Sequence, residues 1–174
     1  MENITAARPA SIEYAPYYGK YISLVPEGDV VVSLSRQLES TLAVLQEIPE
    51  ERADTRYAEG KWSIKELLGH ISDTERIFGY RALRFARNDQ TPLSGFEQDG
   101  YVLNSNFGAY RLSELADEFA HVRRANLSLF RHLDREAWLR SGEASGAQVS
   151  VRALAYIIAG HEAHHIQILR ERYL

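Results

Sequence analysis

Residues 63–88 read Ser63-Ile-Lys-Glu-Leu-Leu-Gly-His-Ile-Ser-Asp-Thr-Glu-Arg-Ile-Phe-Gly-Tyr-Arg-Ala-Leu-Arg-Phe-Ala-Arg-Asn88, with the start signal and the period of a long helix. The Ser63 hydroxyl and the Glu66 carboxylate can each satisfy a free backbone N–H of the first turn, as in a capping box. Apolar residues then recur at helical spacing along one side: Leu67, Leu68, Ile71, Phe78, Ala82 and Phe85. The stretch therefore predicts an amphipathic helix from Ser63 to about Asn88.

Three further stretches follow the same period. A helix with Asp29 as its N-cap carries leucines at positions 34, 38, 42 and 45 and stops at Ile48-Pro49. Another spans roughly Leu112 to Leu133, and the last begins near Ser150 and continues to the C-terminal region. With no alternating strand pattern to compete, the chain is predicted to be all-α, a four-helix bundle. Its two connections of about 20 residues are long for an up-and-down bundle, so they are predicted to be crossover loops that cover something.

The segments outside these helices have a different composition. Residues 89–110 are rich in Pro and Gly and are predicted to be loop, and residues 141–148 are predicted to be a flexible connection. Residues 1–28 contain three prolines, two glycines and four tyrosines. They cannot form one long helix, but rings with polar tips can lie against one. We therefore predict a tyrosine-rich N-terminal arm at residues 1–28, packed on a bundle at residues 29–174.

The composition fits one globular domain without cysteine chemistry. The chain has 174 residues, of which 45% are hydrophobic and 25% charged, enough to close one sizeable core. It contains no cysteine. This excludes disulfides, a cysteine nucleophile, a cysteine-bearing zinc ribbon and an iron–sulfur cluster. Any metal must therefore be held by nitrogen and oxygen ligands.

The charge pattern argues against nucleic-acid and membrane partners. The formal net charge is −4 with both signs interleaved, whereas a duplex-binding domain normally shows a basic face. The basic clusters, Arg123-Arg124 and Arg81, Arg84 and Arg87, are expected on solvated helix faces. The longest run without Asp, Glu, Lys or Arg has 11 residues, too short to span a membrane, and the N-terminus lacks the pattern of a signal peptide. A cytoplasmic location is therefore expected.

The most informative residues for chemistry are His161 and His165. On a helix they are separated by about 40° and one turn, so both imidazoles can reach one point. Leu154, Ile157, Ile158 and Ile168 lie within about 60° of His161 on the same wheel, so both histidines belong to the buried stripe. Their polar atoms then need partners. Metal ligation is the favoured interpretation, and the alternative is hydrogen bonding to each other, to water or to facing side chains.

The candidate third ligand is His70, in the middle of the helix at residues 63–88. Asp73 follows at i+3 and could accept the N–H that a metal-bound imidazole leaves free. The alternative makes His70 a histidine at the border of the apolar face and Asp73 part of a solvated face. Three histidines leave the other coordination positions to water or substrate, which is typical of a working site rather than a structural one.

The segment His161-Glu162-Ala-His-His165 also matches the H-E-x-x-H motif of zinc peptidases, in which the glutamate is the general base. Those enzymes typically take a third ligand from downstream, but only nine residues follow His165 and none is His or Asp. Glu162 also projects about 100° from His161, at the margin of the buried stripe. The peptidase interpretation is therefore disfavoured. Asp73 and Glu162 are candidates, by proximity only, for a general base or for residues beside the metal ligands.

Two stretches carry a family resemblance. Gly60-Lys-Trp-Ser-Ile-Lys-Glu-Leu-Leu-Gly-His-Ile-Ser-Asp-Thr-Glu75 and Gly160-His-Glu-Ala-His-His-Ile-Gln-Ile168 resemble the second-helix and last-helix signatures of the DinB-like (DinB/YfiT) superfamily. The resemblance covers roughly residues 29 to 174. It implies a four-helix bundle, often a homodimer, with a divalent metal, usually nickel or zinc, on His70, His161 and His165. Relatives include metal-dependent S-transferases that use low-molecular-weight thiols such as bacillithiol or mycothiol, and others are labelled metal-dependent hydrolases.

Two functional hypotheses follow, from different classes. In the first, the protein is an enzyme in which a metal-bound thiol cosubstrate loses its proton and attacks an electrophilic small molecule, or in which water takes the place of the thiol in a hydrolysis. In the second, the protein is a non-catalytic metal-binding stress or regulatory protein, which predicts a site closed to ligands. A third, weaker possibility is a bundle without metal, in which His161→Ala would cost only packing stability.

Overall fold

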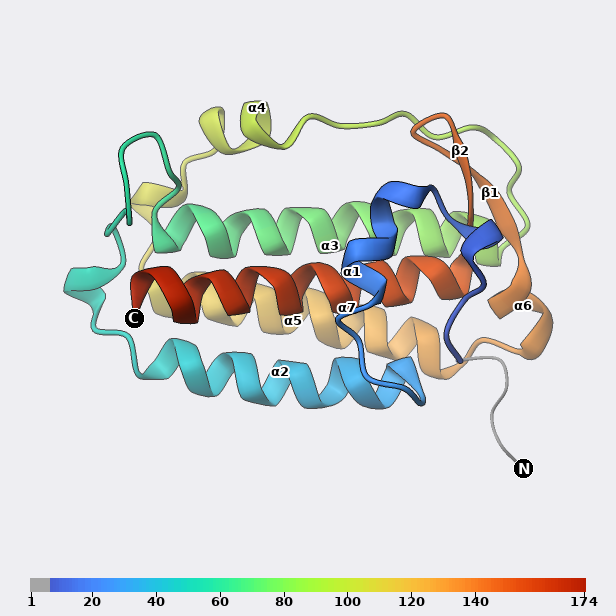
Figure 1. The fold of residues 1–174 in the computed structure, drawn as a ribbon, viewed down its shortest axis with the longest axis horizontal. Helices are drawn as coiled ribbons and strands as arrows, with labels where there is room; N and C mark the ends of the chain where they lie inside the picture. Colours follow the sequence, from blue (N-terminus) through green and yellow to red (C-terminus); the bar gives the residue numbers. More distant parts are fainter. Residues whose placement is uncertain (1–6) are drawn as a thin grey trace.

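The computed structural model describes residues 7–174 and has the predicted four-helix bundle architecture (Figure 1). The bundle helices are α2 (Val30–Gln46), α3 (Ile64–Ala86), α5 (Leu112–Arg131) and α7 (Val151–Ile168). Both α7 and α5 pack against α3 and α2. After α3 the chain crosses back along the outside of the bundle, so that α3 and α5 run in the same direction (Figure 1). This segment is the predicted long crossover loop.

Three bundle helices begin where a side chain accepts a backbone N–H of the first turn. Asp29 accepts from Val31 at 2.8 Å, and Ser150 accepts from Ala153 at 3.1 Å. The predicted capping box of α3 is present: the Glu66 N–H donates to the Ser63 hydroxyl at 3.2 Å, and the Ser63 N–H donates to the Glu66 carboxylate at 2.7 Å. The predicted helix starts are confirmed, whereas α3 and α5 each end two residues before the expected position.

The prediction of a flexible connection at residues 141–148 is wrong. They belong to an antiparallel hairpin of β1 (Ser141–Ala144) and β2 (Ala147–Ser150), which follows the short helix α6 (Arg135–Leu139). The two turn residues, Ser145 and Gly146, have positive φ values of 55° and 75°, as tight hairpins require. Strands this short, built from small residues, carry no alternating apolar pattern that a sequence reading could detect.

The crossover also contains local structure where the sequence predicts only loop. It includes α4 (Gln98–Leu103) and a 3-10 turn at Phe107–Ala109. The Glu97 carboxylate caps α4 by accepting the N–H groups of Asp99 at 3.2 Å and Gly100 at 2.7 Å. Phe107 packs on Gly69 of α3, where a Cβ atom would lie 2.4 Å from its ring. The crossover is therefore fixed on α3 directly beside His70.

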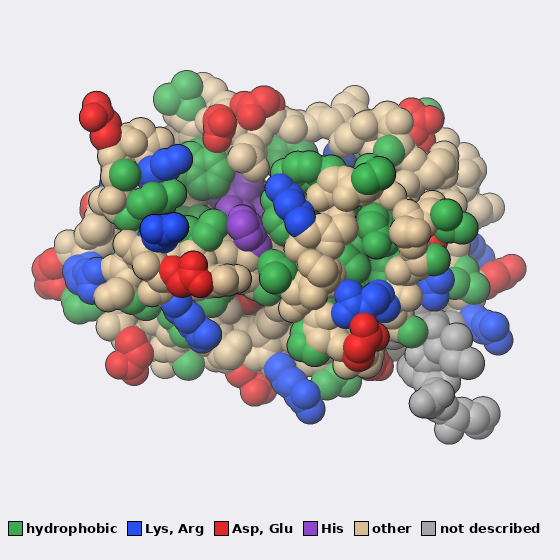
Figure 2. Space-filling view, in the orientation of Figure 1, with side chains coloured by type: hydrophobic (Ala, Val, Ile, Leu, Met, Phe, Trp, Pro, Cys, Tyr) green, Lys and Arg blue, Asp and Glu red, His purple; other side chains and the backbone are tan. Residues whose placement is uncertain are grey.

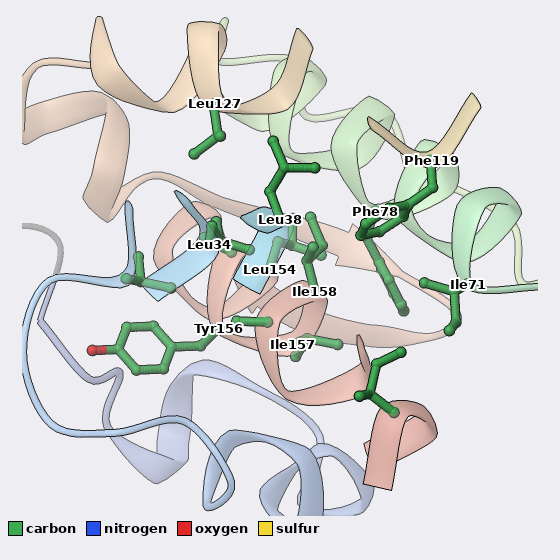
Figure 3. Close-up of a cluster of buried hydrophobic side chains, with 14 of the residues drawn as sticks. Leu34, Leu38, Ile71, Phe78, Phe119, Leu127, Leu154, Tyr156, Ile157 and Ile158 are labelled. Carbon is green, nitrogen blue, oxygen red and sulfur yellow. The ribbon is translucent and has the colours of Figure 1, made fainter. Parts of the chain in front are cut away.

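The interior of the bundle is mainly apolar, but several charged side chains are buried in it as well. Figure 3 shows side chains from all four bundle helices meeting in the core: Leu34, Leu38, Ile71, Phe78, Phe119, Leu127, Leu154, Ile157 and Ile158. Arg81 and Arg123, expected on solvated faces, are only 2% and 0% exposed. Arg81 donates to the Ser94 carbonyl at 2.9 Å and the Ser145 hydroxyl at 3.0 Å. Its burial could not be predicted, because these partners come from segments that the sequence does not place near α3.

Residues 7–28 lie along α7 and contain the short helix α1 (Gly19–Ile22), in which Tyr21 and Ile22 are buried. Gly160 of α7 permits this contact, because a Cβ atom there would lie 2.0 Å from the Tyr21 carbonyl oxygen. Arg8 donates to the carbonyl oxygens of Ile22 and Val25 at 2.7 and 2.5 Å. Residues 1–6 of the predicted arm lie outside the described residues, and the division at residue 28 stays a prediction.

Among the helices of residues 7–174, none combines the length and the apolar character that a bilayer crossing requires.

Candidate metal centre

Three histidines from two helices meet in the interior. His70 comes from α3, and His161 and His165 come from successive turns of α7. The Nε2 atom of His161 lies 3.0 Å from Nε2 of His70 and 3.1 Å from Nε2 of His165. One ring nitrogen of each lies within 4.8 Å of those of the other two, and all three residues are buried. The structure thus brings together the three histidines that the sequence singles out.

These nitrogens fit a shared cation better than a set of hydrogen bonds. Each ring nitrogen has one in-plane position, which holds either a proton or a lone pair. The Nε2 atom of His161 therefore cannot form good hydrogen bonds to both of its neighbours. Nitrogen ligands about 2.1 Å from one metal ion, at angles of about 90–110°, lie about 3.0–3.4 Å apart. The observed separations match that range, so the three residues are compatible with a divalent metal.

Burial keeps the three imidazoles in the neutral form that binds a metal. It lowers the pKa of His70 to about 4. Burial also lowers the pKa of His161 and His165 well below the usual value, and repulsion from neighbouring histidines lowers both further. At neutral pH the lone pairs are therefore available without loss of a proton.

Two aromatic side chains enclose the histidines. The ring of Trp62 lies 4.6 Å from that of His70 and 6.4 Å from that of His165, measured between centres. The ring of Tyr21 lies 5.5 Å from that of His161. The sequence reasoning missed both. The position of Trp62 directly before the Ser63 cap was a usable signal, whereas nothing local connects Tyr21 with a helix 140 residues further along the chain.

The outer ring nitrogens have few partners, and Asp73 is not among them. The Asp73 carboxylate accepts from Arg76 at 3.2 Å. The Thr74 hydroxyl lies 3.5 Å from Nδ1 of His70, at the limit of a hydrogen bond. The buried Nδ1 atom of His165 has no partner within residues 7–174. Thr74 therefore stands where Asp73 was expected, because the next position along α3 turns towards the interior.

Glu162 also lies away from the histidines, in a second polar cluster. Its carboxylate accepts from Arg123 at 2.6 Å and from the Thr41 hydroxyl at 2.6 Å. Arg123 also donates to both oxygens of Glu75, at 2.7 and 2.8 Å. We call these four residues the arginine network. Because Glu162 is held there, the geometry does not favour the peptidase interpretation or a general-base role for this carboxylate.

The arginine network is fully buried, and its charges stabilise one another. The exposed fraction is 0% for Arg123, 2% for Glu75 and 1% for Glu162. Burial alone would lower the pKa of Arg123, but the charges of Glu162 and Glu75 outweigh it and hold that pKa above its ordinary value. The guanidinium therefore stays charged and acts as the centre of a structural network.

The histidines lie between two cavities. One, of about 270 Å³, is lined by His70 and His161 together with Tyr17, Tyr21 and Thr74. The other, of about 300 Å³, is lined by His165 together with Lys61, Trp62 and Asp99. Figure 2 shows histidine side chains at the base of a hollow that is open on this face of the molecule. The three-histidine cluster therefore borders a cavity on each side, although its members are buried.

A helical bundle with three buried imidazoles from two neighbouring helices defines a class of proteins that can carry a metal in the bundle core. The sequence profile of the DinB superfamily matches residues 33–169. The chain therefore belongs to the DinB superfamily.

A comparison of structures agrees with this assignment. YfiT from Bacillus subtilis, described as a probable metal-dependent hydrolase with an unusual four-helix bundle topology, superimposes with a TM-score of 0.66 at 15% sequence identity. The match covers 96% of this chain and 94% of that chain. At this level of identity the likeness shows the fold alone. No curated protein matches the chain.

Proposed function

We propose that the protein is an enzyme that uses a divalent transition metal on His70, His161 and His165 to transform a small molecule. The main support is the convergence of three buried imidazoles, with Nε2 separations of 3.0 and 3.1 Å, between two cavities. Imidazole ligands suit nickel and zinc, the metals we expect. When bound, such an ion lowers the pKa of a coordinated thiol or water and so supplies a nucleophile at neutral pH.

The contribution of the chain is to position and to shield. α3 and α7 fix the imidazoles, and the Thr74 hydroxyl at 3.5 Å helps to orient the ring of His70. The rings of Trp62 and Tyr21 cover two sides of the cluster and exclude water there. The uncovered directions lead into the cavities, where substrates have access to the imidazole nitrogens.

The two cavities favour a reaction with two organic ligands. A thiol-dependent S-transferase must hold a low-molecular-weight thiol and an electrophile together, whereas a hydrolase needs room for one substrate and water. We therefore place S-transfer first and hydrolysis second, and the description of YfiT as a probable metal-dependent hydrolase supports the second. A non-catalytic metal-binding protein is disfavoured because its site would be closed. We further expect a cytoplasmic homodimer without a nucleic-acid or membrane partner.

Elemental analysis of the purified protein, without a histidine tag, tests the metal. We expect close to one nickel, zinc or other transition-metal ion per chain in the wild type and none in the double variant His161→Ala/His165→Ala. His164→Ala is the matched control, because His164 is a half-buried neighbour outside the cluster. It should keep the metal.

Thiol-transfer and ester-hydrolysis screens on the loaded protein then distinguish the two reactions. A wild type that takes up no metal after being offered several would overturn the proposal. Equal loading of the wild type and the double variant would do the same.

A further inference from the structure

The cavity beside His70 and His161 has a second polar feature, formed by the segment before α2. Tyr17 and Tyr21 both line this cavity, and their hydroxyl oxygens lie 3.4 Å apart. The Lys20 ammonium lies 4.1 Å from the centre of the Tyr17 ring and 4.8 Å from that of the Tyr21 ring. Two phenol groups therefore line the cavity, and the exposed Lys20 ammonium lies over the rings of both.

These three residues have hydrogen-bond donors that lack acceptors. Two hydroxyl groups carry two protons, and the bond between them uses only one. Neither hydroxyl has another acceptor within residues 7–174, so at least one phenol proton is available to a ligand. The exposed Lys20 adds three N–H donors beside the two rings and belongs to none of the ion pairs found within residues 7–174.

The start of α4, which lines the same cavity, does not pair with these donors. Glu97 and Gln98, at the start of α4, line the same cavity. Both oxygens of the Glu97 carboxylate, however, accept backbone N–H groups, from Asp99 and Gly100. This carboxylate serves as the helix cap, and no hydrogen bond or ion pair within residues 7–174 joins it to Tyr17, Lys20 or Tyr21.

The backbone that carries these donors is held in place before any ligand arrives. The Tyr21 backbone lies against Gly160 so closely that a Cβ atom would not fit. The ring of Tyr18 packs edge-on against Phe78 of α3 at 5.9 Å between centres. Because the segment is already ordered, a ligand does not have to bear the entropic cost of fixing it.

We propose that Tyr17, Lys20 and Tyr21 form an anion subsite that binds a carboxylate or similar oxyanion of the substrate while its reacting group lies at the three histidines. This inference rests on the proposed function and narrows its substrate class to small molecules with a negative oxygen group near the reacting atom. A neutral analogue of the same shape leaves the donors unpaired and is discriminated against for that reason.

The test uses the full chain loaded with Co(II), whose absorption bands report the binding of a thiolate. The probes are 3-mercaptopropionate and its neutral amide, which differ only in the group that would meet the subsite. We expect the wild type to bind the carboxylate about tenfold more tightly, as one charge-assisted hydrogen bond allows. Lys20→Gln and Tyr21→Phe should each remove most of this preference and leave the affinity for the amide within about twofold.

The variants separate a binding role from a structural one. Tyr21→Phe keeps the ring that packs on His161 and His164, and Lys20 is exposed, so both variants should fold. Arg124→Gln removes an exposed positive charge on α5 and should keep the full preference. Equal affinity of the wild type for the two probes, or an unchanged preference in both variants, would overturn the subsite alone. Failure of the wild type to bind cobalt would overturn the metal-dependent function and the subsite with it.

Discussion

Two buried polar clusters share helices α3 and α7, and they differ in how completely their atoms are paired; the arginine network also includes Arg123 of α5 and Thr41 of α2. In the arginine network, Arg123 joins Glu75 to Glu162, and Thr41 donates to the remaining oxygen of Glu162. In the histidine cluster, three ring nitrogens converge on one point, and Nδ1 of His165 has no partner among the described residues. We call the arginine network closed, because its side chains are paired with one another, and the histidine cluster open, because a ring nitrogen lacks a partner. His161 and Glu162 are neighbours in the sequence, so a single step along α7 separates the closed cluster from the open one.

The difference indicates which buried polar residues maintain the fold and which await a ligand. Burying charged or polar groups is tolerated when their partners are present, and each unpaired atom needs another explanation. In the arginine network, the partners that make burial tolerable are the side chains of the network itself. The histidine cluster lies beside two cavities and contains a buried ring nitrogen without a partner among the described residues. Such departures from complete pairing are expected at functional sites.

The strongest test of this contrast removes the centre of the closed cluster. Arg123→Met should lower the free energy of unfolding by about 3–5 kcal/mol, because it leaves two carboxylates buried without their cation. Urea denaturation measures the change. Arg124→Met, at the exposed neighbouring position, should change it by less than about 0.5 kcal/mol. A loss below about 1 kcal/mol for Arg123→Met would mean that the network is not the stabilising unit described here.

Acid should destabilise the metal-free protein through the three buried histidines. In the unfolded chain each histidine gains a proton as the pH falls through about 6.5. In the folded protein burial lowers the pKa of His70 to about 4 and that of His161 and His165 well below the usual value. Stability is therefore full above about pH 6.5 and is lost as the pH falls below it, by about 1 kcal/mol for each of these histidines between pH 7 and 5.5.

Urea denaturation of the metal-free protein at several pH values measures this loss. The triple variant with Gln at positions 70, 161 and 165 is the control and should lack this part of the slope. Parallel pH profiles for the wild type and the triple variant would show that these histidines do not resist protonation.

Metal addition should stabilise the folded protein through the histidine cluster and not through the arginine network. At a metal concentration a hundred times the dissociation constant, the wild type should gain about 2.7 kcal/mol. For a domain of this size that corresponds to an increase of roughly 5–10 °C in Tm. The shift should persist in His164→Ala and disappear in His161→Ala, as followed by differential scanning fluorimetry with nickel or zinc. An equal shift in His161→Ala would place the metal elsewhere.

The smallest expected effect comes from Glu162→Gln, which tests whether the two clusters are independent at the neighbouring positions His161 and Glu162. Glu162→Gln keeps the shape but removes one charge from the arginine network, so we expect a loss of stability of about 1–2 kcal/mol. Metal content should be unchanged, because Glu162 points to Arg123 and Thr41 rather than to the histidines. Parallel unfolding and elemental analyses give both quantities. A lower metal content in a folded Glu162→Gln protein would contradict the separation of the two clusters.

The bundle and the meeting of His70, His161 and His165 could be predicted because both depend on helical periodicity and on local caps. The period gives the face of each histidine, and the His-x3-His spacing brings two of them to one point. The hairpin at Ser141–Ser150 could not be predicted, because its turn residues and small side chains carry no periodic signal. The wall formed by Tyr21 depends on contact between distant segments, which no local pattern contains.

Arg123, which was expected on a solvated face, is a more instructive failure, and its partner Glu75 presents the same conflict. Arg123 lies four residues after Phe119 and four before Leu127, and Glu75 lies between Ile71 and Phe78, so both interrupt buried stripes at helical spacing. The helical spacing therefore places both residues on the buried face, but charged residues are expected on the surface unless they are paired. Their partners lie on other helices, and a single sequence gives the face of a residue without giving the residue opposite it.

The contact between Tyr21 and Gly160 also determines when the site can form during protein synthesis. The segment with Tyr21 leaves the ribosome well before its binding surface on α7, together with His161 and His165, has been made. His70 waits through some ninety residues of synthesis for the other two histidines. The packing of Tyr21, the cavity wall and the three-histidine cluster are therefore all completed only once α7 has been made, and a chain truncated before α7 has no site.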